Sequence, residues 1–311
     1  MLKILRGLTA LALLACAPAL AQLTDITQTP NAVNAGIKKS LEDQVAAGIG
    51  DALTPDSSIY LIQRDPFRAI SRGQKLFQRK FTIDQGLGPR TGNGHGDIET
   101  TPIIGAGLSD SCAGCHSRPH GSAGVGGNVF TRPDSRDAPH LFGLGLVEMI
   151  ADEMTTQLRD IQSQALATAA NNGTPKTVHL KSKGVSFGRI TAHPNGVVDT
   201  DDIEGLDEDL RVKPFFAEGS SFSIREFSVG AFNAEMGMQS GDPVLLAASQ
   251  GQTVTTAAGM VLDGALDILP APPVETILTD GDGDGKVNEI DPALIDHTLG
   301  YLGHTHEPIK I

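Results

Sequence analysis

One five-residue segment, Cys112-Ala-Gly-Cys115-His116, constrains this chain of 311 residues more than any other. Two thiols three positions apart fit on one turn of a helix, and the histidine that follows presents its imidazole beside them. The pattern Cys-x-x-Cys-His is typical of covalent haem c attachment, with two thioethers and one histidine on the iron. The sequence therefore predicts Cys112 and Cys115 as covalent anchors and His116 as the axial iron ligand.

Other chemistries that use paired cysteines fit less well. A zinc site needs a second ligand pair, and the sequence has no further Cys-x-x-Cys or His-x-x-x-His at finger-like spacing. A thioredoxin-like redox pair normally follows a strand, whereas residues 105–111 form a glycine-rich stretch. A disulfide across a single turn would constrain little of the chain. We therefore expect haem at this segment.

The first 21 residues have the pattern of a secretory signal peptide. A basic start is followed by the apolar run 8–15 and by Ala19-Leu-Ala21, a small-x-small cleavage site. The run is shorter than the roughly 20 apolar residues of a spanning helix, and no other membrane segment is evident. We expect a periplasmic or otherwise extracytoplasmic protein. Alternatively, Leu13-Leu-Ala-Cys16 resembles a lipoprotein box, which would make Cys16 a lipid anchor.

The charge balance limits the class of partner. The formal charge is −13, and removal of the signal takes away Lys3 and Arg6 but no acid, which leaves −15. Phosphate binding requires a basic surface, so nucleic acid is not an expected partner. We expect a redox partner protein or a small oxidant such as peroxide. An acidic surface could dock a basic redox partner, but the acidity is more simply explained as an ordinary route to solubility.

Segments on both sides of the cysteines add a resemblance to a known family. They are Pro66–Phe77 with Gly73 in its apolar stripe, Gly86–Arg90, Arg136–Ile150, Asp207–Phe216 and Ser223–Gly237. In this order they resemble the bacterial di-haem oxidoreductase family, of the peroxidase or thiol oxidoreductase type, from about residue 66 onwards. The resemblance implies two cytochrome c domains, one relaying electrons and one carrying out chemistry. This chain has a single Cys-x-x-Cys-His and stops at Ile311, so it is either a fragment lacking the second haem domain or a single-haem relative.

From these features we expect a mainly α fold, a cytochrome c-like haem domain with long irregular loops and a few short strands. The expected divisions are a signal peptide (1–21), an N-terminal segment (22–65), the haem domain (66–175) and an irregular region with short strands (176–311). The haem is expected between helices at about 67–79, 111–117 and 144–168. Gly143 and Gly145 would let the backbone approach the porphyrin closely, and residues 177–198 alternate like a hairpin.

The second axial ligand decides whether a haem carries electrons or catalyses a reaction. Met149, Met154, Met236, Met238 and His140 are the candidates, each with a core or loop role as the alternative. The planar fork of an arginine suits a haem propionate. The candidates for that role are Arg90, Arg118, Arg136 and Arg225, with Arg118 nearest to the cysteines.

A second motif, at residues 280–291, resembles an EF-hand calcium loop. Asp280, Asp282, Asp284, Asn288 and Asp291 provide oxygens at positions 1, 3, 5, 9 and 12. Lys286 stands at position 7, where a backbone carbonyl binds, and Gly285 stands at the sharp turn. Aspartate at position 12 reaches less far than the usual glutamate. We expect structural calcium here, with an acidic turn as the alternative, followed by a helix that starts at Pro292.

Together these observations predict an exported c-type haem protein that catalyses or supports electron transfer, as in a di-haem peroxidase-type oxidoreductase. The first alternative is a single-haem electron carrier without catalytic activity. The second is a haem-free adhesion or calcium-scaffold protein. Substrate, redox potential and oligomeric state are not encoded in any of these motifs.

Overall fold

The computed structural model describes residues 45–79, 81, 111–116, 139, 141, 143–216, 219–236, 238–272 and 287–304. The described helices are α2 (Ser58–Arg64), α3 (Pro66–Gln78), α4 (Cys112–His116), α5 (Leu144–Asn172), α6 (Ile224–Met236), α7 (Pro243–Ser249) and α8 (Pro292–His304). The described strands are β1 (Lys176–Ser182), β2 (Val185–Ala192), β3 (Val198–Asp199), β4 (Thr253–Thr255) and β5 (Val261–Asp263).

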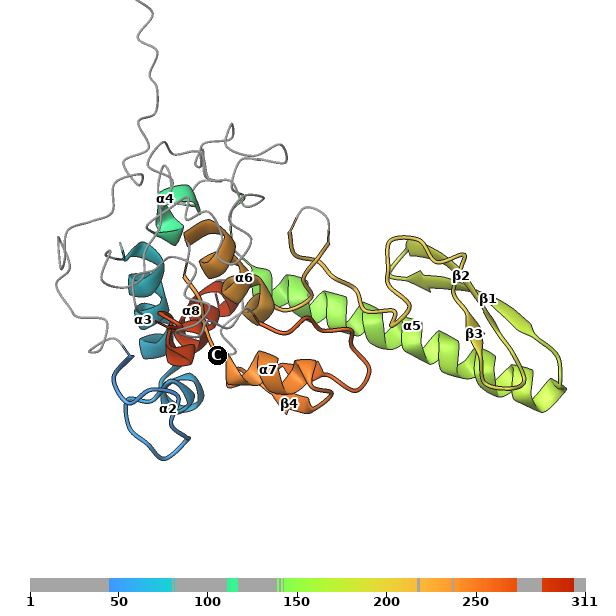
Figure 1. Ribbon diagram of the computed structural model, residues 1–311, viewed down its shortest axis with the longest axis horizontal. Coiled ribbons are helices and arrows are strands. Elements are labelled where there is room, and N and C mark those ends of the chain that lie inside the picture. Colours follow the sequence, from blue (N-terminus) through green and yellow to red (C-terminus); the bar gives the residue numbers. More distant parts are fainter. Residues whose placement is uncertain are drawn as a thin grey trace, which may run out of the picture.

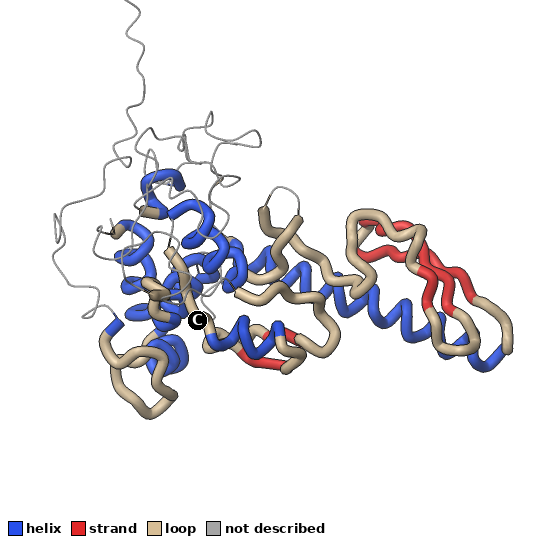
Figure 2. Tube along the Cα trace, viewed as in Figure 1, coloured by secondary structure: helices blue, strands red, loops and turns tan. Residues whose placement is uncertain are grey.

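These elements form a helical body and an arm. Helices α2, α3, α6 and α8 gather in the body, and α4 lies at its edge (Figure 1). Helix α5 runs out of the body, and strands β1–β3 lie along its outer half (Figure 2). Helix α7 packs with the small β4–β5 hairpin beside the body.

The expectation of a mainly α, cytochrome c-like fold is wrong. The described residues contain two antiparallel sheets, one in the order β1-β2-β3 and one formed by β4 and β5. The β1–β2 hairpin confirms the alternation seen at 177–198, but it forms part of a three-stranded sheet with an apolar core of its own. Leu180, Phe187 and Ile190 pack there with Met154 and Leu158 of α5. The fold therefore combines helices with antiparallel sheets.

Helix α3 begins at the position that the sequence predicts. The side chain of Asp65 accepts a hydrogen bond from the backbone N–H of Arg68, and Pro66 occupies the first turn, where no N–H donor is needed. Its buried stripe consists of Ala69, Gly73, Leu76 and Phe77. This stripe faces α8, so the last described helix closes against the first part of the body.

Helix α5 has 29 residues between two glycines in the left-handed conformation, Gly143 (φ 79°) and Gly173 (φ 63°). Its buried positions include Ala151, Leu158 and Ala165, a spacing that keeps one stripe of the helix turned to its neighbours. In the described part of the chain no helix, α5 included, is both long and apolar enough to span a membrane.

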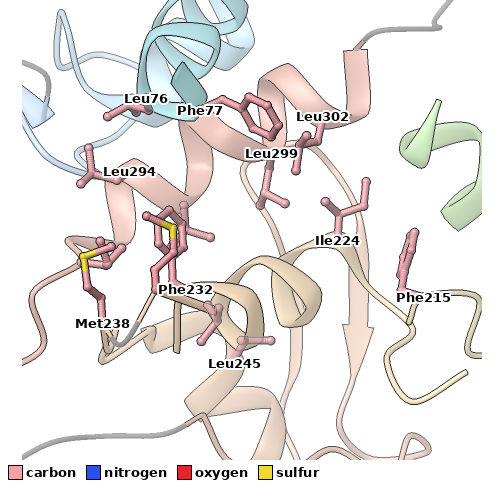
Figure 3. Packing of buried hydrophobic residues seen from close by; sticks show 14 of the residues in the cluster. Leu76, Phe77, Phe215, Ile224, Phe232, Met238, Leu245, Leu294, Leu299 and Leu302 are labelled. Atoms are coloured by element: carbon pink, nitrogen blue, oxygen red, sulfur yellow. The ribbon is translucent and has the colours of Figure 1, made fainter. Parts of the chain in front are cut away.

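The main core lies between α3, α6 and α8 (Figure 3). Phe77, Phe232 and Leu299 are among its buried members. Within this apolar region Arg225 is 2% exposed and forms ion pairs with Asp242 (2.7 Å) and Asp296 (2.6 Å). These pairs connect α6 with the start of α7 and with α8.

Candidate haem site

Helix α4 consists of the five residues of the cysteine motif and nothing else. It packs against α3, and the side chains of Cys112 and Ala113 contact the edge of the main core. The described structure therefore confirms a helical turn within the stretch expected at 111–117, over residues 112–116, and this turn holds the two cysteine positions and the histidine together. The backbone of Cys115 belongs to this turn, while its side chain lies outside the described atoms.

The imidazole of His116 is held in one orientation. Its Nδ1 lies 2.7 Å from the carbonyl oxygen of Pro139. Because a carbonyl oxygen can only accept, Nδ1 carries the proton and the lone pair is on Nε2. In the described part of the chain, Nε2 has no hydrogen-bond partner. Metal-binding histidines have this arrangement, in which the second nitrogen donates to a backbone carbonyl.

The surroundings of His116 favour its neutral form. Burial lowers the pKa of the ring below its ordinary value, and the hydrogen bond to Pro139 opposes this shift in part. The ring of Phe77 lies 6.3 Å from the ring of His116, centroid to centroid. Neutral imidazole is the form that binds a metal ion, so the donor set of Cys112, Cys115 and His116 fits haem c.

Of the methionines considered as a second axial ligand, Met236 is brought to the cysteine motif. The Cys112 thiol donates to the thioether of Met236, with 3.9 Å between Sγ and Sδ. Met236 is 3% exposed at the end of α6. Formation of a thioether at Cys112 would remove the S–H donor, which would leave the sulfur of Met236 available to another partner.

The other methionines lie elsewhere. Met149 is 53% exposed on α5, and Met154 belongs to the second core beside the three-stranded sheet. Met238 is fully buried in the main core. His140, the histidine candidate, lies outside the described residues.

Of the propionate candidates, Arg225 is the one that the structure describes. Arg225 is occupied by two carboxylates in the core, which is a structural role. Arg90, Arg118 and Arg136 lie outside the described residues.

The two glycines at the start of α5 have roles within the protein itself. Gly143 adopts a left-handed conformation at the start of the helix. A Cβ on Gly145 would lie 2.6 Å from the carbonyl oxygen of Gly303, so the close approach made there is to α8. The expected approach to a porphyrin is replaced, in the described structure, by helix packing.

Most of the expected calcium loop, including Asp280, Asp282, Asp284 and Lys286, lies outside the described residues. Asn288 adopts a left-handed conformation (φ 54°), and Oδ1 of Asp291 accepts from the backbone N–H of Ala293 at 2.8 Å. Asp291 therefore caps α8, which confirms a helix starting at Pro292. Among the described residues there is no cluster of three histidine, cysteine or acidic side chains suited to a metal ion. Calcium stays a prediction.

One partner of the motif, Pro139, was not found from the sequence, and the other, Met236, was one of several candidates there. Pro139 provides only a backbone carbonyl, which has no sequence signal, and it stands 23 positions after His116. Met236 stands 124 positions after Cys112, and it reaches the cysteine because α6 packs against the same core.

Comparisons of the chain with protein-family models, with curated proteins and with solved structures give no match. The resemblance to the di-haem oxidoreductase family therefore stays a prediction. The function must be argued from the residues themselves.

Proposed function

We propose that this chain is a c-type haem protein that transfers electrons outside the cytoplasm. Cys112 and Cys115 would form the two thioethers, and His116 would be the axial ligand. The observation that supports this most directly is the orientation of His116. Its Nδ1 donates to the Pro139 carbonyl oxygen at 2.7 Å, and Nε2 keeps a lone pair with which it could bind iron.

The neighbouring side chains suit a large apolar cofactor. Phe77 lies beside the histidine, and Cys112, Leu141 and Leu144 pack at the edge of the main core. Such walls exclude water and lower the local dielectric, which tunes the potential of a bound redox group. A haem held here supplies one-electron redox chemistry, while the protein anchors it and sets its surroundings.

Met236 is our candidate for the second axial position. Its thioether is buried and is already in contact with Cys112. If the sulfur of Met236 bound a haem iron, it would raise the redox potential and favour electron transfer over catalysis. We therefore favour an electron carrier, which would act alone or as the relay part of a di-haem oxidoreductase. Its redox partner would be a protein or a small oxidant such as peroxide.

The test is covalent attachment of haem to the full chain, expressed with its own N-terminus in a host that matures c-type cytochromes. The wild-type protein should gain the mass of one haem, and its pyridine haemochrome spectrum should be that of two thioethers. Cys115→Ala should shift that spectrum to the form with a single thioether. Cys112→Ala combined with Cys115→Ala should abolish covalent attachment.

Met149→Leu is the matched control, because it changes an exposed methionine remote from the motif. It should load haem as the wild type does. A wild-type chain that matures without covalent haem, or a Cys115→Ala chain with an unchanged two-thioether spectrum, would contradict the proposal.

A further inference from the structure

We infer that a cavity between α3, α5, α6 and α8 is a binding site for a small apolar amine, with Glu148 as the residue that pairs with the ammonium group. The cavity is lined by none of the residues of the cysteine motif. The inference therefore does not rest on the proposed haem function.

The cavity has a volume of about 220 Å³. A cavity of about 150 Å³ in another protein accommodates benzene, so this one has room for a ring with a short chain. Its apolar walls include Ile70 of α3, Ile224 of α6 and Leu299 of α8. Space is left because glycines face it, among them Gly145 and Gly300. An apolar body of the ligand would be buried against these walls.

Glu148 is the acidic group in this lining. Its side chain belongs to α5 and is 4% exposed. Oε1 accepts a hydrogen bond from the backbone N–H of Ile224 at 3.1 Å. In the described part of the chain, Oε2 has no partner. Because Glu148 lines the cavity, a ligand there with an N–H group could donate a charge-assisted hydrogen bond to Oε2.

The charges around the cavity favour a cation over a neutral donor. Arg225 also lines the cavity, but its guanidinium is held by Asp242 and Asp296. Together with Glu148, these side chains carry three carboxylates and one guanidinium. An ammonium group would therefore enter a region with an excess of negative charge.

Two further charged groups act on Glu148 from its surroundings. Asp152, one turn further along α5, raises the pKa of Glu148, and Arg211 lowers it. Arg211 is itself paired with Asp152 and lies 3.6 Å from Asp267. Burial is the largest cause of the shift, and it raises the pKa of Glu148 to about 7. The carboxylate form, and with it amine binding, should therefore increase as pH rises through neutrality.

The mouth of the cavity lies between exposed residues. Met149 is 53% exposed, and Ala258, in the loop between β4 and β5, is exposed as well. Because both residues line the cavity and reach solvent, we infer that a ligand enters between them. A larger side chain at Ala258 would narrow the mouth without disturbing the buried core.

The experiment is a calorimetric titration of the exported full chain with benzylamine at about pH 8. We expect one site in the wild type, and binding weaker by at least about tenfold in Glu148→Gln. Glutamine keeps the acceptor for the Ile224 N–H, so this variant should fold. Ala258→Leu should weaken binding to a similar extent. Glu153→Gln, at an exposed glutamate of the same helix, is the matched control and should bind as the wild type does.

Two further titrations make the result specific. Benzyl alcohol, which has the same shape without the charge, should bind about tenfold more weakly than benzylamine, and benzylamine should lose affinity at about pH 5.5. The visible spectrum of any bound haem, recorded during the titration, should stay constant. Equal binding to Glu148→Gln, equal binding of the alcohol, spectral changes that follow the binding curve, or no binding to folded protein would each overturn the inference. None of these outcomes bears on covalent haem attachment.

Discussion

Gly73 of α3 and His297 of α8 lie so close that no side chain fits between the two helices. A Cβ atom on Gly73 would overlap the carbonyl oxygen of His297 and would lie 2.6 Å from Cβ of Tyr301. The glycine is therefore a requirement of this helix crossing. The Phe77 and Tyr301 rings, 5.4 Å apart, meet one turn further along.

Gly73→Ala should destabilise the protein by about 3 kcal/mol, because the methyl group must push the two buried helices apart. Urea denaturation followed by circular dichroism measures this change. Gly230→Ala in α6 is the control, since a Cβ there would meet ring atoms of Phe216 at 3.8 Å and more. That variant should be neutral or slightly stabilising, because alanine is the better helix former. Equal stability of both variants would contradict this account of the crossing.

Arg225→Leu should cost about 3–5 kcal/mol of stability, because it leaves Asp242 and Asp296 buried without a counter-charge. The same denaturation experiment tests it. Arg189→Leu removes a pair with Asp202 in which both side chains are more than half exposed, and it should cost less than about 1 kcal/mol. A small effect of Arg225→Leu would mean that these carboxylates are not paired in the core.

Glu148→Gln should make the protein more stable at alkaline pH. The folded-state pKa of Glu148 is about 7, raised above the ordinary value of 4.5. The contribution of Glu148 to the stability of the fold is therefore fully present below about pH 4.5 and is lost as pH rises through 7. The loss is on the order of 3 kcal/mol. Between about pH 4.5 and pH 8, the free energy of unfolding should therefore vary less with pH in the glutamine variant than in the wild type, as measured by denaturation at each pH. An unchanged pH profile would show that Glu148 is not buried as described.

His297 should produce a dependence of opposite sign. Its ring is fully buried, neither nitrogen has a hydrogen-bond partner in the described part of the chain, and burial with nearby Arg72 lowers its pKa to about 4. The contribution of His297 to stability is therefore fully present above about pH 6.5 and is lost as pH falls through 4. His297→Leu should remove up to about 3 kcal/mol of this acid sensitivity. If the stability of His297→Leu fell at acid pH as steeply as that of the wild type, His297 would not be the source of this acid sensitivity.

Met236→Ala should change the spectrum of the haem-loaded protein if the thioether is the second axial ligand. The wild type should be low-spin with a methionine-to-iron band that the variant lacks, and only the variant should respond to peroxide. Met238→Leu, at the other buried methionine of this segment, should keep the band. A wild-type haem that is high-spin and reacts with peroxide would instead favour a catalyst.

The sequence was most informative where a few neighbouring residues determine a structure. The start of α3 follows from Asp65 and Pro66, and the start of α8 follows from Asp291 and Pro292. The turn of the cysteine motif and the β1–β2 hairpin follow equally from short-range spacing. In each case the caps, turns and periodicities act over a few residues, so no distant contact is needed to interpret them.

The fold class could not be obtained in this way. Alternation at 177–198 predicts strands, but it does not say that they bury an apolar face against Met154 and Leu158 of α5. That contact packs the three strands β1–β3 against α5 as a sheet with its own apolar core. Non-local burial decides such architecture, and it leaves only a weak pattern in the sequence.

By itself, then, the sequence determined that Cys112, Cys115 and His116 share one helical turn, because spacing on such a turn is a local property. The tertiary structure alone decided which groups surround that motif. It placed the Pro139 carbonyl against His116 and the Met236 sulfur against Cys112. It also buried Glu148 in the wall of the cavity between α3, α5, α6 and α8. These contacts join residues far apart in the chain, and their energies depend on burial that exists only after the helices have packed.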